Sequence, residues 1–187
     1  SGPAIAQTLF GEHNPAGKLT ITFPKNVGQI PVYYNMKNTG RPFDANNKYT
    51  SKYLDVSNEP LYPFGYGKSY TSFDYSDIEL SSTNMEMNGS ITVSATIKNT
   101  GKYAGKEVVQ FYIRDLVGSV TRPVKELKGF EKISLAPGES KKVSFTVTVK
   151  DLEFYTRDMS YKAEPGDFRV FIGPSSAEGL EADFTLK

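Results

Sequence analysis

Carboxyl groups and one imidazole are the side chains in this sequence that could act as acids, bases or metal ligands. The 187 residues include 21 Asp and Glu, a single histidine, His13, and no cysteine. One histidine cannot build a multi-histidine metal site or a catalytic triad alone, and the lack of cysteine excludes thiolate ligands and a Cys nucleophile. The turn sequence at residues 14–17, Asn-Pro-Ala-Gly, directly follows His13. We therefore interpret His13 as a turn residue that could still complete a site with another domain.

Most carboxylates lie in expected turns or at the polar positions of expected strands, where polar and apolar residues alternate. Examples are Glu139, Asp151, Glu164 and Asp167. Such positions favour a solvated or turn-stabilising role over catalysis. The pattern singles out none of them as a catalytic group.

A loop that carries Arg41, Tyr49, Lys52 and Tyr53 is the strongest candidate for ligand contact. Tyrosine rings offer stacking faces to a sugar, and a guanidinium offers a fork of hydrogen-bond donors. Arg41, Tyr49 and Tyr53 are therefore candidates for the rim of a substrate site. We favour the alternative that the loop anchors an extended segment to a neighbouring domain, because ordering such a segment needs anchors in any case.

A second aromatic group, formed by Phe64, Gly65, Tyr66, Gly67 and Tyr70, is interpreted as an elbow between domains. Glycine lets the backbone turn sharply, and the rings can wedge between two folded surfaces. The rival interpretation is an exposed aromatic platform that binds a glycan.

Charge and hydropathy exclude several partner classes. The chain has 22 basic and 21 acidic residues and a net charge of +1, without a long run of either sign. Neither a nucleic-acid footprint nor a polybasic membrane patch is indicated. No run approaches the roughly 18 apolar residues of a membrane-spanning helix, and the first residues do not resemble a signal peptide, so we expect any export signal upstream.

The first part of the chain combines one short helix with an irregular stretch. Pro3 to Phe10 is predicted to be helical, capped by Gly11, with Ile5 and Leu9 one turn apart. So short a helix is not stable alone in water, so its apolar side chains need a partner, and we infer that the chain was cut from a larger protein. Residues 14–73 read as an extended connector that holds one short strand at 18–23. Its seven tyrosines should lie against a folded surface.

After residue 73 the sequence alternates as half-buried strands do. Apolar residues recur at every second position in residues 91–97 and again in 143–149. Five further candidate strands are expected, at residues 75–80, 107–114, 124–135 (broken near Gly129), 167–172 and 182–186. About seven strands predict an all-β fold, an antiparallel sandwich of the fibronectin-III or immunoglobulin kind.

Turn sequences separate these strands. Residues 136–139 and 164–167 both have Pro and Gly placed for a type II turn, and Asp151 could cap one helical turn at 151–154. We place the boundary near Phe73, which gives an irregular segment at 1–72 and a β-sandwich at 73–187.

Six ordered segments resemble the end of the α/β sandwich domain of family 3 glycoside hydrolases. They are residues 9–19 (LFGEHNPAGKL), 22–24 (TFP), 27–34 (VGQIPVYY), 38–42 (NTGRP), 49–55 (YTSKYLD) and 61–71 (LYPFGYGKSYT). Residues 99–101, 108–112, 122–130, 135–139 and 171–173 resemble the fibronectin-III-like C-terminal domain of that family. The bacterial periplasmic β-glucosidases are the most similar group, although Lys68 and Lys52 replace the usual Leu and Arg.

The resemblance implies a larger enzyme with a barrel domain first, an α/β sandwich next and this domain last. Retaining hydrolysis needs two carboxyl groups about 5 to 5.5 Å apart. In the family, the Asp nucleophile lies in the barrel and the acid/base Glu lies upstream of the matched stretch. We therefore expect no catalytic residue, metal or organic cofactor in this chain, and no activity from it alone.

The expected role is that of an accessory domain in a periplasmic or secreted bacterial β-glucosidase. It would cover apolar surface on the upstream catalytic domains, fix their placement and support a possible homodimer. β-Glucoside oligosaccharides are expected to be partners of the whole enzyme and not of this chain alone. The alternatives are an autonomous carbohydrate-binding module and an adhesion module, since similar sandwiches host many functions.

Overall fold

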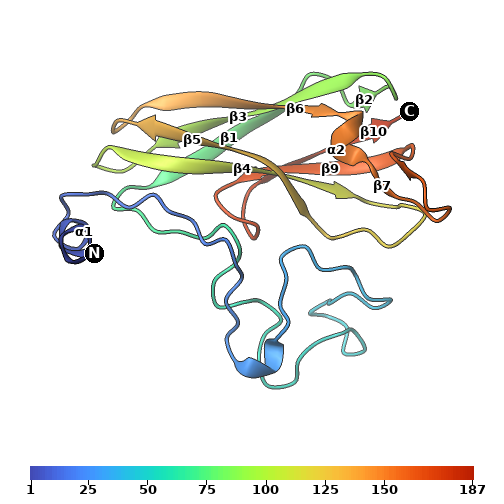
Figure 1. Cartoon of the computed structure of the whole chain (residues 1–187), viewed down its shortest axis with the longest axis horizontal. Coiled ribbons are helices and arrows are strands. Elements are labelled where there is room, and N and C mark those ends of the chain that lie inside the picture. The colour runs from blue at the N-terminus through green and yellow to red at the C-terminus, as the bar shows by residue number, and fades with distance from the viewer.

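The computed structural model describes all of residues 1–187 and shows a two-layered β-sandwich with an irregular segment beneath it (Figure 1). We call residues 1–72 the leading segment. The all-β class and the sandwich architecture predicted from the sequence are confirmed.

One layer is a three-stranded antiparallel sheet. Its order is β1 (Phe73–Leu80), β3 (Ser90–Asn99) and β6 (Ser140–Thr148). In the register of β3 and β6, Ile91 lies opposite Val147 and Ala95 lies opposite Val143. These are the residues whose alternation predicted strands, and all four are buried.

The other layer has five strands. Its order is β2 (Asn84–Met85), β10 (Leu180–Leu186), β9 (Gly166–Gly173), β4 (Gly105–Asp115) and β5 (Glu126–Leu135). All pairs are antiparallel except that of β10 with β2, which is parallel. The break expected near Gly129 is instead a register shift within a continuous β5: Gly129 lies opposite Phe111, and Leu127 lies opposite Tyr112.

The remaining elements are short. They are α1 (Gly2–Leu9), the 3-10 helix η1 (Val27–Gln29), α2 (Val149–Leu152) and the small hairpin of β7 (Phe154–Tyr155) and β8 (Tyr161–Lys162). Gly11 follows α1 with φ +81°, as expected of a helix-ending glycine. No helix is long and apolar enough to cross a membrane.

The core lies between the two sheets and contains 19 buried apolar residues, all between Met85 and Leu186. Phe111 on β4 stacks on Phe145 of β6 across the layers, with ring centroids 4.9 Å apart. Because the leading segment contributes none of these residues, the sandwich has a complete core of its own.

Three further local predictions are wrong. Residues 18–23 form no strand, because Phe23 makes only an isolated bridge with Tyr62 and the segment has no longer partner to pair with. Gly166 has no positive φ and instead begins β9 opposite Leu186, whereas Gly138, at φ +78°, does make the expected turn.

Asp151 does not begin a helical turn either. It is the third residue of α2, and its carboxylate accepts hydrogen bonds from the backbone amide and hydroxyl of Thr148. Thr148 is the residue that caps the helix, in a capping box.

Within this chain, the tyrosines of the leading segment are covered only in part. Only Tyr34 and Tyr66 are partly buried, whereas Tyr33 and Tyr49 remain 62% and 69% exposed. Because the sandwich covers only one side of the segment, the expectation that these tyrosines lie against a folded surface stays a prediction for the exposed ones.

Candidate functional site

The leading segment meets the sandwich on the outer face of β4. Gln110 and Tyr112 point away from the core on this strand, yet they are only 3% and 0% exposed. A central strand is buried on both faces only when something covers its outer side. Here residues 34 and 64–65 of the leading segment supply that cover, through the contacts described next.

Gln110 joins three parts of the chain. Its Nε2 donates hydrogen bonds to the carbonyl oxygens of Gly65 (3.0 Å) and Pro174 (2.6 Å). Its Oε1 accepts a hydrogen bond of 2.5 Å from the Tyr112 hydroxyl. Because the amide is buried, each of these bonds satisfies a group that would otherwise be costly to remove from water.

The backbone at Gly65 has φ +80°, and a Cβ added there would lie 2.0 Å from Gln110 Oε1. Gly67 is equally close to its neighbour, with a Cβ position 2.3 Å from the carbonyl oxygen of Gly17. Only glycine allows either approach.

Aromatic stacking surrounds this contact. Tyr34 stacks on Phe64 with centroids 4.3 Å apart and meets Tyr112 edge-on at 5.9 Å. The Tyr34 hydroxyl accepts a hydrogen bond from the amide of Leu127 on β5. Burial, with a smaller contribution from Tyr34, raises the pKa of Tyr112 well above its usual range, so the phenol stays neutral and keeps its bond to Gln110.

Lys125, the residue directly before β5, borders the same contact. Its ammonium lies 3.9 Å from the ring centroid of Phe171 and 5.5 Å from that of Tyr112, and it donates a 2.8 Å hydrogen bond to the carbonyl of Ser176. Burial lowers the pKa of Lys125 to about 8, opposed by the negative charge of Glu181.

The other elbow residues face the leading segment itself. Tyr66 stacks on Tyr62 with centroids 5.0 Å apart. The Tyr70 hydroxyl donates a 2.6 Å hydrogen bond to the carbonyl of Thr8, the penultimate residue of α1. Phe64 and Gly65 therefore contact the sandwich, while Tyr66, Gly67 and Tyr70 hold the segment together.

A buried ion pair makes a second connection. Lys18 Nζ lies 2.8 Å from Glu107 Oε1, with side chains 14% and 5% exposed. The same oxygen accepts a hydrogen bond from the Tyr75 hydroxyl of β1. Burial first, and then the Glu107 carboxylate, raise the pKa of Tyr75 far above its usual range, so it remains a hydrogen-bond donor.

Sequence reasoning missed these partners. Glu107 carried one usable signal, because it occupies the same strand phase as Val109, which faces the core; a carboxylate in that phase needs a buried partner. Nothing local marked Gln110, Tyr112 or Lys125.

The candidate rim residues lie apart from this contact. A loop closed by the bond from the Ser51 amide to the Arg41 carbonyl holds Arg41 and Tyr49. The Tyr53 hydroxyl donates a 3.3 Å hydrogen bond to the carbonyl of Gln29. No hydrogen bond joins the side chains of Arg41, Tyr49 and Tyr53 to one another, and their assignment to a substrate rim stays a prediction.

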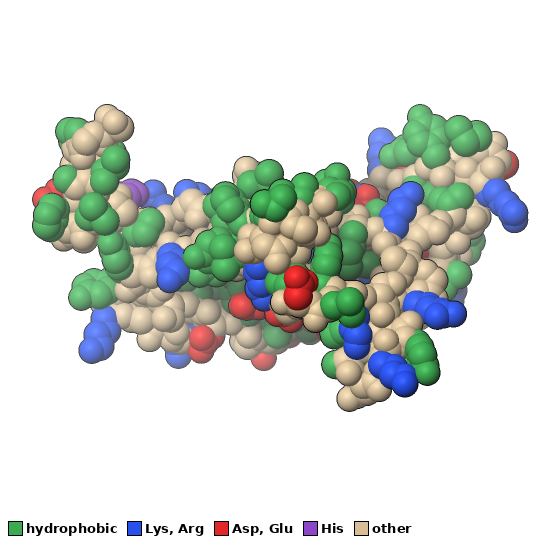
Figure 2. Space-filling model, turned by 90° about the horizontal axis from the view of Figure 1, so that it is seen from below, with side chains coloured by type: hydrophobic (Ala, Val, Ile, Leu, Met, Phe, Trp, Pro, Cys, Tyr) green, Lys and Arg blue, Asp and Glu red, His purple; other side chains and the backbone are tan.

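Exposed apolar side chains mark the side of the leading segment that the sandwich does not cover. Ile5, Leu9 and Phe10 are 58%, 71% and 84% exposed, and Val27 is 83% exposed. In the view from below, hydrophobic side chains gather at the end of the molecule that carries α1 and again near its middle (Figure 2). Patches of this kind are typical of surfaces that contact another domain or protein.

Comparison with known proteins covers the whole length of the chain. The Glycosyl hydrolase family 3 C-terminal domain matches residues 1–70, and the Fibronectin type III-like domain matches residues 107–176. A periplasmic β-glucosidase from Salmonella typhimurium is 55% identical over 99% of this chain and 24% of its own length. A putative β-xylosidase from Formosa agariphila is 51% identical over 98% of this chain and 23% of its own length.

A solved structure agrees. The crystal structure of a β-glucosidase from Listeria innocua in complex with glucose matches with a TM-score of 0.92 and 46% identity, over 99% of this chain and 26% of that one. The chain thus spans about a quarter of the length of the relatives it matches.

Proposed function

The chain belongs to glycosyl hydrolase family 3, and we propose that it is the C-terminal accessory part of an enzyme that hydrolyses terminal, non-reducing β-D-glucosyl residues. The residues that would carry out the reaction belong to upstream domains of the same polypeptide. The role of this chain is to stabilise those domains and fix their placement.

The two-sided leading segment is the observation that carries this proposal. One side is fixed to the sandwich by Gln110, the stacked rings and the ion pair of Lys18 with Glu107. The other side leaves the apolar side chains of α1 in solvent. Exposure of large apolar side chains is unfavourable by roughly 25 cal/mol per Å², so a covering partner would stabilise the segment.

We further propose that residues 1–72 form the closing part of an upstream α/β domain and residues 73–187 an independent sandwich. Phe64, Gly65, Tyr66, Gly67 and Tyr70 then form the elbow between them. Arg41, Tyr49 and Tyr53 are retained as candidates for the rim of the upstream substrate site, and a homodimer of the whole enzyme is retained as a possible assembly.

A periplasmic or secreted location is proposed by analogy with the Salmonella typhimurium relative, which is named as periplasmic. Locating the encoded protein by cell fractionation would test this. Recovery in the periplasm or medium supports it, and recovery with the cytoplasm contradicts it.

Activity assays test the function directly. The 187-residue chain and the product of the whole gene that encodes it are each assayed on p-nitrophenyl β-D-glucoside and β-D-xyloside, because the relatives include proteins named for both sugars. We expect hydrolysis, with preference for the glucoside, from the whole product alone. Hydrolysis by the chain itself, or none by either protein, would contradict the proposal.

A further inference from the structure

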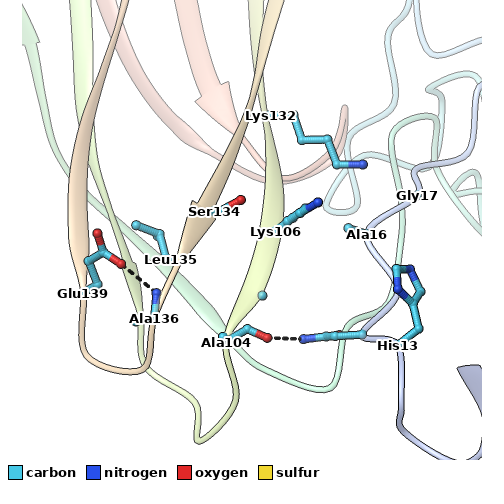
Figure 3. Close-up of a pocket in the computed structure, with 12 residues that line it drawn as sticks. His13, Ala16, Gly17, Ala104, Lys106, Lys132, Ser134, Leu135, Ala136 and Glu139 are labelled. Atoms are coloured by element: carbon cyan, nitrogen blue, oxygen red, sulfur yellow. Dashed lines mark hydrogen bonds between the residues drawn. The ribbon is translucent and has the colours of Figure 1, made fainter.

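A hollow of about 500 Å³ lies where the leading segment passes the ends of β4 and β5. One wall is made by residues 13–17 of the leading segment, and the other by strand residues that include Lys106, Lys132 and Ser134. Figure 3 shows the two walls facing each other across an open space. The hollow is separate from the contact around Gln110.

Two lysines give the hollow its charge. Lys106 on β4 lies opposite Ser134, and Lys132 comes two residues before Ser134 on β5, so the two lysines are diagonal neighbours on one face of the sheet. Both side chains extend from the sheet toward the chain that carries His13, Ala16 and Gly17 (Figure 3). His13 stands on the opposite wall, which brings three groups that can carry positive charge around one space.

No carboxylate neutralises these groups. None of the ion pairs in the structure includes Lys106, Lys132 or His13. Glu139 is the only acidic residue that lines the hollow, and its Oε2 accepts a 2.7 Å hydrogen bond from the amide of Ala136 within its own turn. The neighbouring Glu107 is already paired with Lys18.

The walls are fixed in place without a ligand. Asn14 Nδ2 donates a 2.9 Å hydrogen bond to the carbonyl of Ala104, which links the two walls. Figure 3 draws this bond as the dashed line at Ala104. Asn14 Oδ1 accepts hydrogen bonds from the Ser69 hydroxyl and the Tyr70 amide. Because the walls are already held together, binding does not have to order the backbone around the hollow.

We propose that this hollow binds the oxyanion group, carboxylate or phosphate, of a small anionic ligand such as an acidic sugar. The ammonium groups of Lys106 and Lys132 contact the oxyanion from the sheet, and the Ser134 hydroxyl and His13 supply further hydrogen-bond donors. A concave site lined by two lysines fits one compact anion better than a polyanion, which needs a long basic surface. The proposal does not depend on the accessory role above.

Titration of the 187-residue chain followed by backbone NMR tests the binding. Three probes are added separately at low salt: inorganic phosphate, D-glucuronate and, as the neutral control, D-glucose. Saturable shifts at the amides of residues 104–106 and 132–136 with either anion, and none with glucose, support the proposal; the anion that binds more tightly identifies the source. No saturable shift with either anion, or equal shifts with glucose, would overturn it.

Matched charge variants separate a site from general attraction. Lys106→Gln with Lys132→Gln removes both ammonium groups, while Lys98→Gln with Lys150→Gln removes two exposed lysines that lie outside the hollow and also lack ion pairs. We expect the first double substitution to weaken anion binding by about tenfold, because it removes two charge-assisted contacts that are partly exposed. The control double substitution should change the affinity by less than about twofold. Equal weakening by both pairs would overturn the proposal.

Discussion

Gln110 on β4 donates a hydrogen bond from its buried side-chain amide to the backbone carbonyl of Gly65, 45 residues earlier in the chain. This bond and the stacked rings of Tyr34 and Phe64 bury the outer face of β4, a central strand. The leading segment is thereby held to the sandwich as a fixed layer.

Gly65→Ala tests how tightly that layer is fitted. The added Cβ meets Gln110 Oε1 at 2.0 Å and also forces a side chain onto a backbone with φ +80°. We expect the free energy of unfolding to fall by about 2 to 4 kcal/mol, measured by urea denaturation.

Gly138→Ala is the matched control. Gly138 has nearly the same φ, +78°, but nothing lies within 4 Å of its added Cβ. It should lose only about 1 kcal/mol, the cost of the backbone strain. Equal losses at the two sites would show that the approach of Gly65 to Gln110 is not a tight contact.

Lys18→Met tests the second connection. It leaves the Glu107 carboxylate, whose side chain is 5% exposed, without its cation, and we expect a loss of about 2 to 4 kcal/mol. Lys142→Met breaks an ion pair with Glu79 in which the side chains are 53% and 61% exposed, and should change stability by less than about 0.5 kcal/mol. Chemical denaturation of both variants at pH 7 makes the comparison. Similar small losses would mean that Glu107 does not depend on Lys18.

The lysine among the rings predicts a dependence of stability on pH. Lys125 in the folded chain has its pKa lowered from 10.5 to about 8. Between these values the unfolded state binds more protons than the folded state, so the contribution of this group to the free energy of unfolding rises with pH. Below pH 8 its buried charge lowers stability.

The measurement is the free energy of unfolding of the wild type and of Lys125→Met at pH 7.5 and 9.5. The free energy of unfolding should increase between these pH values by about 1 kcal/mol more in the wild type than in the variant. This difference is smaller than the full pKa shift would give, because the side chain is partly exposed. Lys150→Met, which removes an exposed lysine, should keep the wild-type increase. Parallel behaviour of wild type and Lys125→Met would rule out the lowered pKa.

Removing the leading segment tests the proposed domain boundary. Residues 73–187 contain all 19 members of the core cluster, so they should still unfold in one cooperative transition. Stability should nevertheless fall by about 3 to 5 kcal/mol, because Gln110 and Glu107 lose buried partners. A fragment without a cooperative transition would show that the sandwich is not independent.

The sequence predicts best what is decided locally. Alternation at residues 91–97 has the period of a strand, and every expected inward side chain there is buried. Pro137 and Gly138 fix their turn through their own backbone preferences. The strand expected at 18–23 failed because a strand also needs a partner, which no local pattern supplies.

The contacts of the candidate site lie beyond such reasoning. Gln110 and Tyr112 read as ordinary strand residues, and only the arrival of Gly65 and Phe64 from elsewhere in the chain makes them interior. Gly65 and Gly67 could be recognised from the sequence as points where the backbone turns, but their close approach to Gln110 and Gly17 could not. The resemblance to a family supplied the order of the parts, not these bonds.

Hydrogen exchange at α1 tests the central claim most directly. Amide exchange of residues 5–10 is measured by mass spectrometry in the 187-residue chain and in the product of the whole gene. If the apolar side chains of Ile5, Leu9 and Phe10 are covered by upstream domains, exchange of this helix should slow by at least about a hundredfold in the longer protein. Equally fast exchange in both proteins would contradict the claim that the leading segment is a docking layer for the catalytic domains.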